Sequence, residues 1–331
     1  MVRFNKAVNG GEMRIEIIGQ KSMDRGMDFE KNIKAQLIKS LNAVGYEMRS
    51  VFIARVHELE AEIIGQRNIG LISSDFYNTA LGGFDFNLES SHPNAKSLLI
   101  NTAPDCTDYI EFHTDQGIKP LKLPATYHTK NQIGKIRSIF KEFELNYGIE
   151  FNYASLPHKL LAARSGLAKY GRNNVTYSDA FGSFQYLITF TIDIALEEDC
   201  WQEAKLMTAC ENCRKCIKAC PTKALSEPRF TLDAEKCITY LNEYPGEFPK
   251  WVAKEWHNAI IGCTLCTESC PVNKPHINSG TRIESFDISE SQLILSGSPF
   301  EQLPSSVQAK LNNCSLASSY QLLSRNIRAL L

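Results

Sequence analysis

The spacing of hydrophobic residues before residue 199 predicts a domain built from both helices and strands. A period of three or four residues predicts one amphipathic helix, at Phe29, Ile33, Leu37, Leu41 and Val44. The same period predicts a second helix, at Ile133, Ile136, Phe140, Phe143 and Tyr147. Apolar runs at 97–103 and 184–194 predict strands, the second because it is rich in β-branched and aromatic residues. Because helices and strands alternate, we expect an α/β domain here.

Composition and charge describe an ordinary globular chain. It has 331 residues, 43% of them hydrophobic, which excludes a disordered chain and predicts two domains or one large domain with an appended module. The 36 Lys and Arg residues balance 37 Asp and Glu residues, so no global basic excess indicates a nucleic-acid partner. No apolar run reaches the length of a membrane-spanning helix, and the first residues do not form an export signal. We therefore expect a cytoplasmic protein with no membrane partner.

Eight of the eleven cysteines lie between residues 210 and 270, in two runs with one cysteine between them. The first run matches the C-x2-C-x2-C-x3-C-P pattern of bacterial ferredoxins, in Cys210-Glu-Asn-Cys213-Arg-Lys-Cys216-Ile-Lys-Ala-Cys220-Pro221. Zinc is the alternative, since paired C-x2-C motifs also bind it. A zinc site takes four ligands, however, and needs no third close cysteine followed by Cys-Pro. The spacing therefore favours two 4Fe–4S clusters.

The second run, Cys263-Thr-Leu-Cys266-Thr-Glu-Ser-Cys270-Pro271, has only three cysteines, so one ligand comes from elsewhere. In two-cluster ferredoxins the fourth cysteine of each run binds the other cluster. Applied here, this rule gives cluster 1 the ligands Cys210, Cys213, Cys216 and Cys270. Cluster 2 then takes Cys220, Cys237, Cys263 and Cys266, and the lone Cys237 completes the set. The other three cysteines are expected to be small packing residues, with Cys106 worth attention because it lies in a loop: Cys106, Cys200 and Cys314.

Four segments follow from these patterns. Residues 1–28 are expected to form an N-terminal extension, residues 29–198 an α/β domain for substrate and cofactor, residues 199–280 the double-cluster domain, and residues 281–331 a Ser-rich tail with at most a short terminal helix. No G-x-G-x-x-G turn opens a helix after a strand, and no Walker-type loop occurs, so a Rossmann nicotinamide site is not indicated. An α/β domain of this size ahead of the clusters indicates a redox partner or substrate site in the same chain.

Two blocks of residues carry a family resemblance. Residues 160–174 read Leu-Leu-Ala-Ala-Arg-Ser-Gly-Leu-Ala-Lys-Tyr-Gly-Arg-Asn-Asn, and Phe181-Gly182-Ser183 follows. Together with the lone Cys237 and the run from Gly262 to Asn273, they resemble the epoxyqueuosine reductases over residues 55–275. The related reductive dehalogenases share the cofactors. The resemblance implies an α+β fold, with an α/β, nitroreductase-like cobalamin-binding core followed by a ferredoxin-like domain. It also implies an oxidoreductase with base-off cobalamin beside two 4Fe–4S clusters.

The resemblance also implies roles for single residues. Eight would lie along the corrinoid pocket: Lys159, Arg164, Gly171, Arg172, Asn173, Phe181, Gly182 and Ser183. Tyr127 and His128 match a Tyr-His pair near the substrate, although such a pair can also serve capping or packing. The family's proton-donating Asp corresponds to Asn152, whose amide has no proton to give at neutral pH. Tyr127, His128 or His158 would then replace it, unless His158 only opens a helix after Pro157.

This departure changes the expected substrate. We expect a cobalamin-dependent iron–sulfur reductase that acts on a small organic substrate rather than on tRNA-bound epoxyqueuosine. A polyanion such as tRNA is held largely by Lys and Arg contacts, and this chain has no excess of basic residues. Epoxyqueuosine in tRNA is one alternative, and a non-catalytic electron-transfer or corrinoid-handling protein is another. A low-potential ferredoxin or flavodoxin is the expected electron donor. Three basic residues lie between the predicted ligand cysteines: Arg214, Lys215 and Lys218. Their side chains would raise the reduction potential of the cluster, dock an acidic ferredoxin or simply face solvent.

Overall fold

A four-stranded antiparallel sheet is the centre of the first domain. The structure is a computed structural model that describes residues 26–331 except 129, 197–198, 228–229 and 278–279. Within the described chain, the sheet has the order β1 (Glu47–Phe52), β2 (Ser97–Pro104), β8 (Gln185–Ile192) and β5 (Phe151–Tyr153). Leu99 of β2 lies opposite Phe190 of β8. The strands predicted at 97–103 and 184–194 are thus the two central strands of one sheet.

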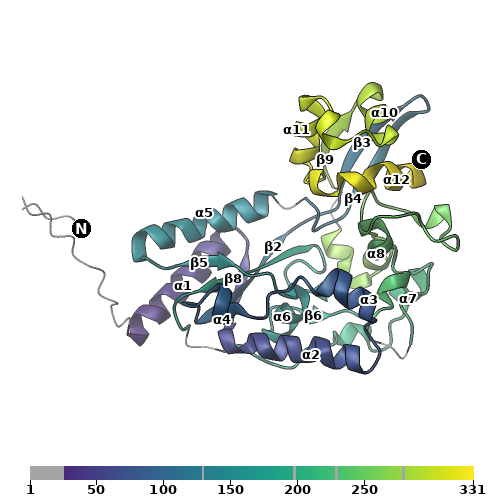
Figure 1. The fold of residues 1–331 in the computed structure, drawn as a ribbon. Helices are drawn as coiled ribbons and strands as arrows, with labels where there is room; N and C mark the ends of the chain where they lie inside the picture. The colour runs from purple at the N-terminus through teal and green to yellow at the C-terminus, as the bar shows by residue number, and fades with distance from the viewer. Residues whose placement is uncertain (1–25, 129, 197–198, 228–229, 278–279) are drawn as a thin grey trace, which may run out of the picture.

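Helices cover both faces of this sheet (Figure 1). On one face, α1 (Met27–Ala43) and α5 (Lys130–Tyr147) pack through Leu37 and Phe140 against the β2 residue Leu99. On the other, α2 (Val56–Asn68) and α6 (His158–Arg164) share a core with Leu98. Because neighbouring residues of a strand face opposite sides, a strand buried on both sides reads as a continuous apolar run.

The two helices predicted from the apolar period are confirmed as α1 and α5. The alternation of helices and strands does not give parallel strands, however, because every pairing within this sheet is antiparallel. The protein is therefore a mixed helix and strand fold of the α+β kind. Among the described helices, none has both the length and the apolar character needed to cross a membrane.

The C-terminal residues form part of a second packed unit, which corrects the expectation of a tail at 281–331. The strand β9 (Arg282–Phe286) pairs with β3 (Asp108–Thr114), which also pairs with β4 (Gly117–Leu123). Figure 1 shows α10 (Ile288–Ser296), α11 (Ser305–Asn313) and α12 (Tyr320–Leu330) gathered beside this sheet, away from α1 and α2. The apolar residues of these helices, together with Phe112 and Phe286, bury a common core. The apolar spacing of α12, with Leu323, Ile327 and Leu330 on one face, is a signal in the sequence for that helix.

Between these units lies the cysteine-rich segment, which consists of loops and short helices. Its α-helices are α7 (Lys215–Ala219), α8 (Ile238–Glu243) and α9 (Leu265–Glu268). Single turns of 3-10 helix complete it at Thr208–Cys210, Ala234–Lys236, Lys254–Trp256 and Pro271–His276. The first domain also has short elements: η1 (Ile53–Arg55), α3 (Ser74–Phe76), the π-helix η2 (Tyr77–Leu81), α4 (Leu88–Ser91), β6 (Lys169–Tyr170) and β7 (Thr176–Tyr177). Of these, α3 and η2 contact α8 of the cysteine-rich segment, through Phe76 and Thr79 against Tyr240.

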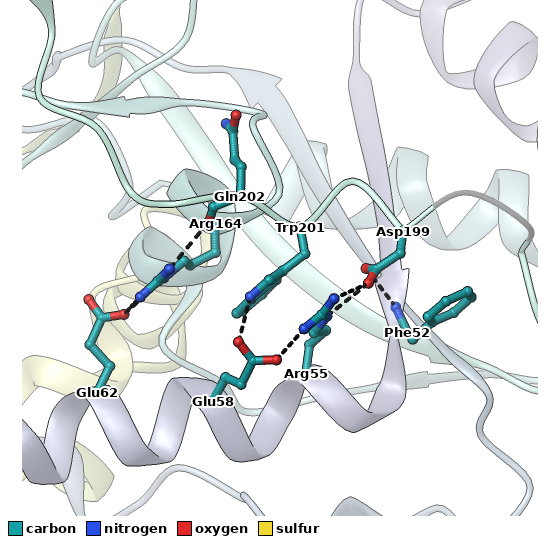
Figure 2. A network of polar contacts seen from close by, with 8 residues as sticks. All are labelled: Phe52, Arg55, Glu58, Glu62, Arg164, Asp199, Trp201 and Gln202. Carbon is teal, nitrogen blue, oxygen red and sulfur yellow. Dashed lines mark hydrogen bonds and ion pairs between the residues drawn. The ribbon is translucent and has the colours of Figure 1, made fainter.

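The segment that enters the cluster domain is held on the first domain by polar contacts around Trp201 (Figure 2). Arg55 donates from Nε to Asp199 Oδ2 at 2.8 Å, and Trp201 donates from Nε1 to Glu58 Oε2 at 2.7 Å. Figure 2 shows the Trp201 ring between two arginines, with the Arg55 guanidinium 5.4 Å from the ring centre. Residues 197–198, which end the predicted α/β domain, lie outside the described residues, and Asp199 belongs to this network.

Arg164→Met is expected to destabilise the fold by about 2 kcal/mol, because hydrogen bonds to charged groups contribute on that order. Arg164 donates from Nε to Glu62 at 2.9 Å, and its guanidinium lies 5.7 Å from the Trp201 ring centre. Arg282→Met is the matched control, since Arg282 is an exposed partner in a surface pair and should change stability by less than about 0.5 kcal/mol. Urea unfolding of both variants measures the difference, and equal losses would remove the assigned role of Arg164.

Candidate functional site

A cavity of about 910 Å³ lies where the first domain meets the cysteine-rich segment. Its walls come from α2, α6 and β8 of the first domain, from the loop before α5, and from residues 230–235, α8 and α9 of the cluster domain. Apolar side chains predominate on the first-domain side, including Ile63, Phe76, Leu156, Phe184 and Leu187. The volume is near the upper end of the usual range for small-molecule sites, so the cavity suits a large organic group.

Neighbouring thiols place the predicted ligand cysteines in two neighbourhoods, and their assignment to the clusters stays a prediction. Burial raises the pKa of Cys216, and the nearby thiols of Cys210, Cys213 and Cys270 raise it further. These are the four predicted ligands of cluster 1. No three His, Cys, Asp or Glu side chains among the described residues stand close enough to share a single metal ion, and the grouping rests on these neighbour relations.

The second group is built in the same way. Burial raises the pKa of the Cys263 thiol, and the nearby Cys237 and Cys220 raise it further. Burial also raises the pKa of the Cys266 thiol, and the nearby Cys263 and Cys237 raise it further. Asn258 also donates from Nδ2 to Cys263 Sγ at 3.2 Å. The lone Cys237 therefore lies near the other three predicted ligands of cluster 2, namely Cys220, Cys263 and Cys266.

The two groups differ in their relation to the cavity. Among the described residues, Cys263, Thr264 and Thr267 line the cavity, and no ligand of cluster 1 does. Cys266 has both Cys263 and the cluster 1 ligand Cys216 among its neighbours. The described cysteines predicted to hold cluster 2 therefore include one that lines the cavity, whereas none of those predicted to hold cluster 1 does.

Tyr127 lies in the cavity wall beside cluster 2. Its hydroxyl donates to Glu243, and Cys237 and Cys263 are close enough to affect its titration. Burial, followed by the neighbouring carboxylate of Glu243, raises the pKa of Tyr127 well above its ordinary value. The ring also lies where a Cβ on Gly262 would stand, so glycine there permits this approach. The phenol therefore keeps its proton at the edge of the cavity.

Glu243 is the residue that sequence reasoning missed. It ends α8 and lines the cavity, and burial raises the pKa of its carboxyl while Lys159 nearby lowers it. No motif marks this position, and only the folding of α8 onto the loop before α5 brings it to Tyr127. Together, Tyr127, Glu243 and Lys159 give the apolar cavity one polar corner.

His128 points away from this corner, although it follows Tyr127 in sequence. Its Nδ1 lies 3.1 Å from Asp108 Oδ2, and it is not among the described residues that line the cavity. Asp105 lies beside this pair and accepts from the backbone N of Thr126 at 2.6 Å, and burial raises the pKa of Asp105 to about 6. His128 and Asp105 thus fix the turn that presents Tyr127.

His128→Asn is expected to destabilise the protein by about 1 kcal/mol near pH 6 and by much less near pH 9. The hydrogen bond to Asp108 raises the pKa of His128, so its charged form is favoured in the folded state. This stabilisation is complete below the ordinary pKa of histidine and is lost as pH rises through the raised value. Urea unfolding at both pH values measures it, with the exposed His57→Asn as control. Equal losses at the two pH values would contradict the assignment.

The other two candidate acids differ in position. His158 lines the cavity, its ring Nε2 lies 3.3 Å from the Ala154 carbonyl, and burial lowers its pKa, so it is neutral at pH 7. Asn152 is exposed on β5 and lines a separate, smaller cavity with Asp193. The structure thus brings Tyr127 and His158 to the main cavity and leaves Asn152 outside it.

Most of the residues expected to hold a corrinoid do not line the cavity but contact other residues behind its wall. Of the eight, all of which the structure describes, Lys159 and Ser183 line the cavity. Asn173 donates to the Tyr177 hydroxyl at 2.9 Å, and side-chain atoms of neighbours occupy the space next to Gly171 and Gly182. The others have different partners: Arg164 binds Glu62, Arg172 binds the Cys210 carbonyl, and Phe181 N donates to Ser178. The neighbouring residues Tyr170, Asn174, Val175 and Thr176 line the cavity instead.

Comparison with known proteins agrees with the cysteine geometry. Residues 209–273 match the family model described as a 4Fe-4S double cluster binding domain. The double-cluster domain predicted at 199–280 therefore contains this match, and the chain carries two 4Fe–4S clusters.

Similarity also extends beyond the clusters. The chain is 30% identical over 231 residues to an epoxyqueuosine reductase of Cellulophaga algicola, covering 57% of this chain and 73% of that protein. The crystal structure of an epoxyqueuosine reductase from Bacillus subtilis matches with a TM-score of 0.64 at 19% identity, over 91% of this chain and 81% of the other. A structure of such an enzyme with an epoxyqueuosine-modified tRNA stem loop gives 0.57 at 20%, over 91% and 84%.

These similarities differ in sequence identity and in the share of each relative that is matched, so they support different conclusions. The solved structures, at this identity, show a shared fold. Three further curated epoxyqueuosine reductases match over 42%, 36% and 42% of their own length, so the chain spans less than half of those relatives. The Cellulophaga relative is matched over most of its length and at sufficient identity to decide the family. The chain belongs to the epoxyqueuosine reductase family.

Proposed function

We propose that this chain is a cobalamin-dependent iron–sulfur reductase whose large cavity holds the corrinoid and the substrate. One observation carries the proposal: the cavity wall contains Cys263, a ligand of cluster 2. A carrier that only passes electrons between proteins needs no cavity of about 910 Å³ against one of its clusters. A reductase needs that contact, because electrons must reach a bound group.

The residues around the cavity fit a corrinoid. The volume suits a large organic group, and the lining combines a set of apolar side chains from the first domain with polar side chains from both domains. Lys159, Ser183 and Gln185 are the polar residues that would hold its periphery, and Phe184 and Leu187 would contact its apolar surface. When bound base-off, the cobalt of cobalamin supplies a centre that takes up electrons one at a time and reduces an organic substrate.

The chain's own groups then provide protons and exclude water. Tyr127 holds its proton at Oη and is oriented by Glu243, so it is the general acid that we propose in place of the missing Asp. A bound group that fills the cavity would exclude water from its apolar side, which would strengthen hydrogen bonds and charge interactions there. His158 also lines the cavity, but burial keeps its ring neutral, so it donates a hydrogen bond rather than a proton at pH 7.

Electrons are proposed to enter at cluster 1, since its ligands lie away from the cavity. Lys215 and Lys218 are exposed on α7, which carries the cluster 1 ligand Cys216. Their charge suits an acidic one-electron carrier, such as a low-potential ferredoxin or flavodoxin.

The relatives favour epoxyqueuosine in tRNA as the substrate, and we propose it as the first to test. One of the solved relatives binds an epoxyqueuosine-modified tRNA stem loop. A smaller organic substrate is the second candidate, and the specific observation in its favour is Asn152, an amide at the position of the family's proton-donating Asp.

Reduction of an epoxyqueuosine-modified tRNA stem loop by the cobalamin-loaded, anaerobic protein tests this proposal. Mass spectrometry of the released nucleosides would show loss of the epoxide oxygen, and the Cys263→Ser variant would show none. Cobalt binding without any loss of oxygen would overturn the tRNA substrate and leave the smaller one. Failure to bind cobalt at all would overturn the reductase and leave electron transfer.

A further inference from the structure

Arg172, which the family resemblance places in the corrinoid pocket, contacts Cys210 instead, a predicted ligand of cluster 1. It lies in the loop between β6 and β7, and its backbone N is 3.4 Å from the Sγ of Cys210. Its guanidinium donates from Nε at 3.1 Å and from Nη2 at 2.7 Å to the Cys210 carbonyl. One residue of the first domain thus gives a ligand of cluster 1 both an N–H donor to sulfur and a fixed positive charge.

Two further charged residues complete this arrangement. Arg214 donates from Nη1 to the carbonyls of Glu211 at 2.9 Å and Cys213 at 3.1 Å. Glu227 forms an ion pair with Arg214 and lies 4.0 Å from the Arg172 guanidinium. The loop that carries two ligands of cluster 1 therefore has two cations against it and one carboxylate that partly offsets them.

The electrostatic consequence has a definite sign. Reduction adds one negative charge to an iron–sulfur cluster, and potentials depend on net charge and on hydrogen bonds to the sulfurs. Nearby cations and N–H donors favour the reduced cluster, whereas a carboxylate disfavours it. The Arg172 side chain is only 20% exposed, so solvent screens its charge less than that of a surface arginine.

We propose that Arg172, with Arg214 and Glu227, sets the reduction potential of cluster 1. Arg172 raises that potential, and Glu227 limits the rise. In the step concerned, one electron passes from the reductant to cluster 1, and no bond in the protein forms or breaks. The inference goes beyond the proposed reductase function, since it needs the two clusters and neither corrinoid nor substrate.

A redox titration with dithionite, followed by electron paramagnetic resonance, tests it on the anaerobic full chain without cobalamin. In Arg172→Met we expect one midpoint to move to lower potential while the other stays. In Glu227→Gln the same midpoint should move to higher potential. Arg172→Lys keeps the charge and should remain nearer to the unchanged protein than Arg172→Met does. Cys213→Ser, which alters a ligand of cluster 1 alone, identifies the midpoint that belongs to that cluster.

Arg282→Met, which removes an exposed arginine on β9, should leave both midpoints in place. A merely structural clamp would not produce opposite shifts from Arg172→Met and Glu227→Gln. Unchanged midpoints, shifts in the same direction, or equal shifts of both clusters would overturn the proposal. If Arg172→Met does not assemble about eight irons, Glu227→Gln decides, and the absence of an upward shift there overturns it.

Discussion

The Cys237→Ser variant is expected to lose cluster 2, so that bound iron falls from about eight to about four atoms per chain. Cys237 belongs to neither close run of cysteines, yet its thiol lies among Cys220 and Cys263. A serine hydroxyl at this buried position is a poor substitute for a thiolate, and the remaining three cysteines cannot complete the cluster. Because cluster 2 adjoins the cavity, reductase turnover should also disappear.

Iron and sulfide analysis after anaerobic reconstitution measures this loss. Cys200→Ser is the matched control, since Cys200 is half-buried in the linker and has no place in either ligand group, and it should keep about eight irons. Retention of about eight irons by Cys237→Ser would show that another residue is the fourth ligand.

Tyr127→Phe is expected to lower turnover by at least about 100-fold, which is the low end of what a positioned general acid contributes. The phenylalanine ring keeps the packing against Gly262 and removes only the hydroxyl that donates to Glu243. Iron and cobalt content should stay unchanged, so that the loss can be assigned to proton supply. Single-turnover kinetics of the loaded enzyme gives the rate of the chemical step.

Tyr153→Phe is the control for this variant, because it makes the same chemical change at a ring that is 48% exposed on β5. It should keep full turnover. Full turnover in Tyr127→Phe would exclude Tyr127 as the acid.

Local sequence patterns predicted the parts of this protein that depend on neighbouring residues in the chain. The three-to-four residue period located α1 and α5, and the apolar runs located β2 and β8. The double-cluster domain also followed from spacing, since a cluster held by closely spaced thiolates constrains the sequence directly. The ligand role that the crossover rule gives Cys237 stays a prediction, and Cys220 is a neighbour of its thiol.

Features that depend on distant contacts were not predictable. Glu243 reaches Tyr127 across 116 positions of sequence, and no motif surrounds it. The C-terminal helices bury their core against β3, β4 and β9, which come from a distant part of the chain, so the packed unit could not be read from the C-terminal segment alone. The family resemblance places Arg172 in the corrinoid pocket, and neighbours of Arg172 in sequence do line the cavity, but its own side chain turns to Cys210.

The most direct test of the account is to purify the protein anaerobically with cobalamin supplied, and to quantify iron, sulfide and cobalt alongside the visible spectrum. The account predicts about eight irons and about one base-off cobalamin per chain, with cobalamin bound in the cavity against cluster 2. About eight irons with no cobalt, at saturating cobalamin, would contradict it and identify the chain as a two-cluster electron carrier.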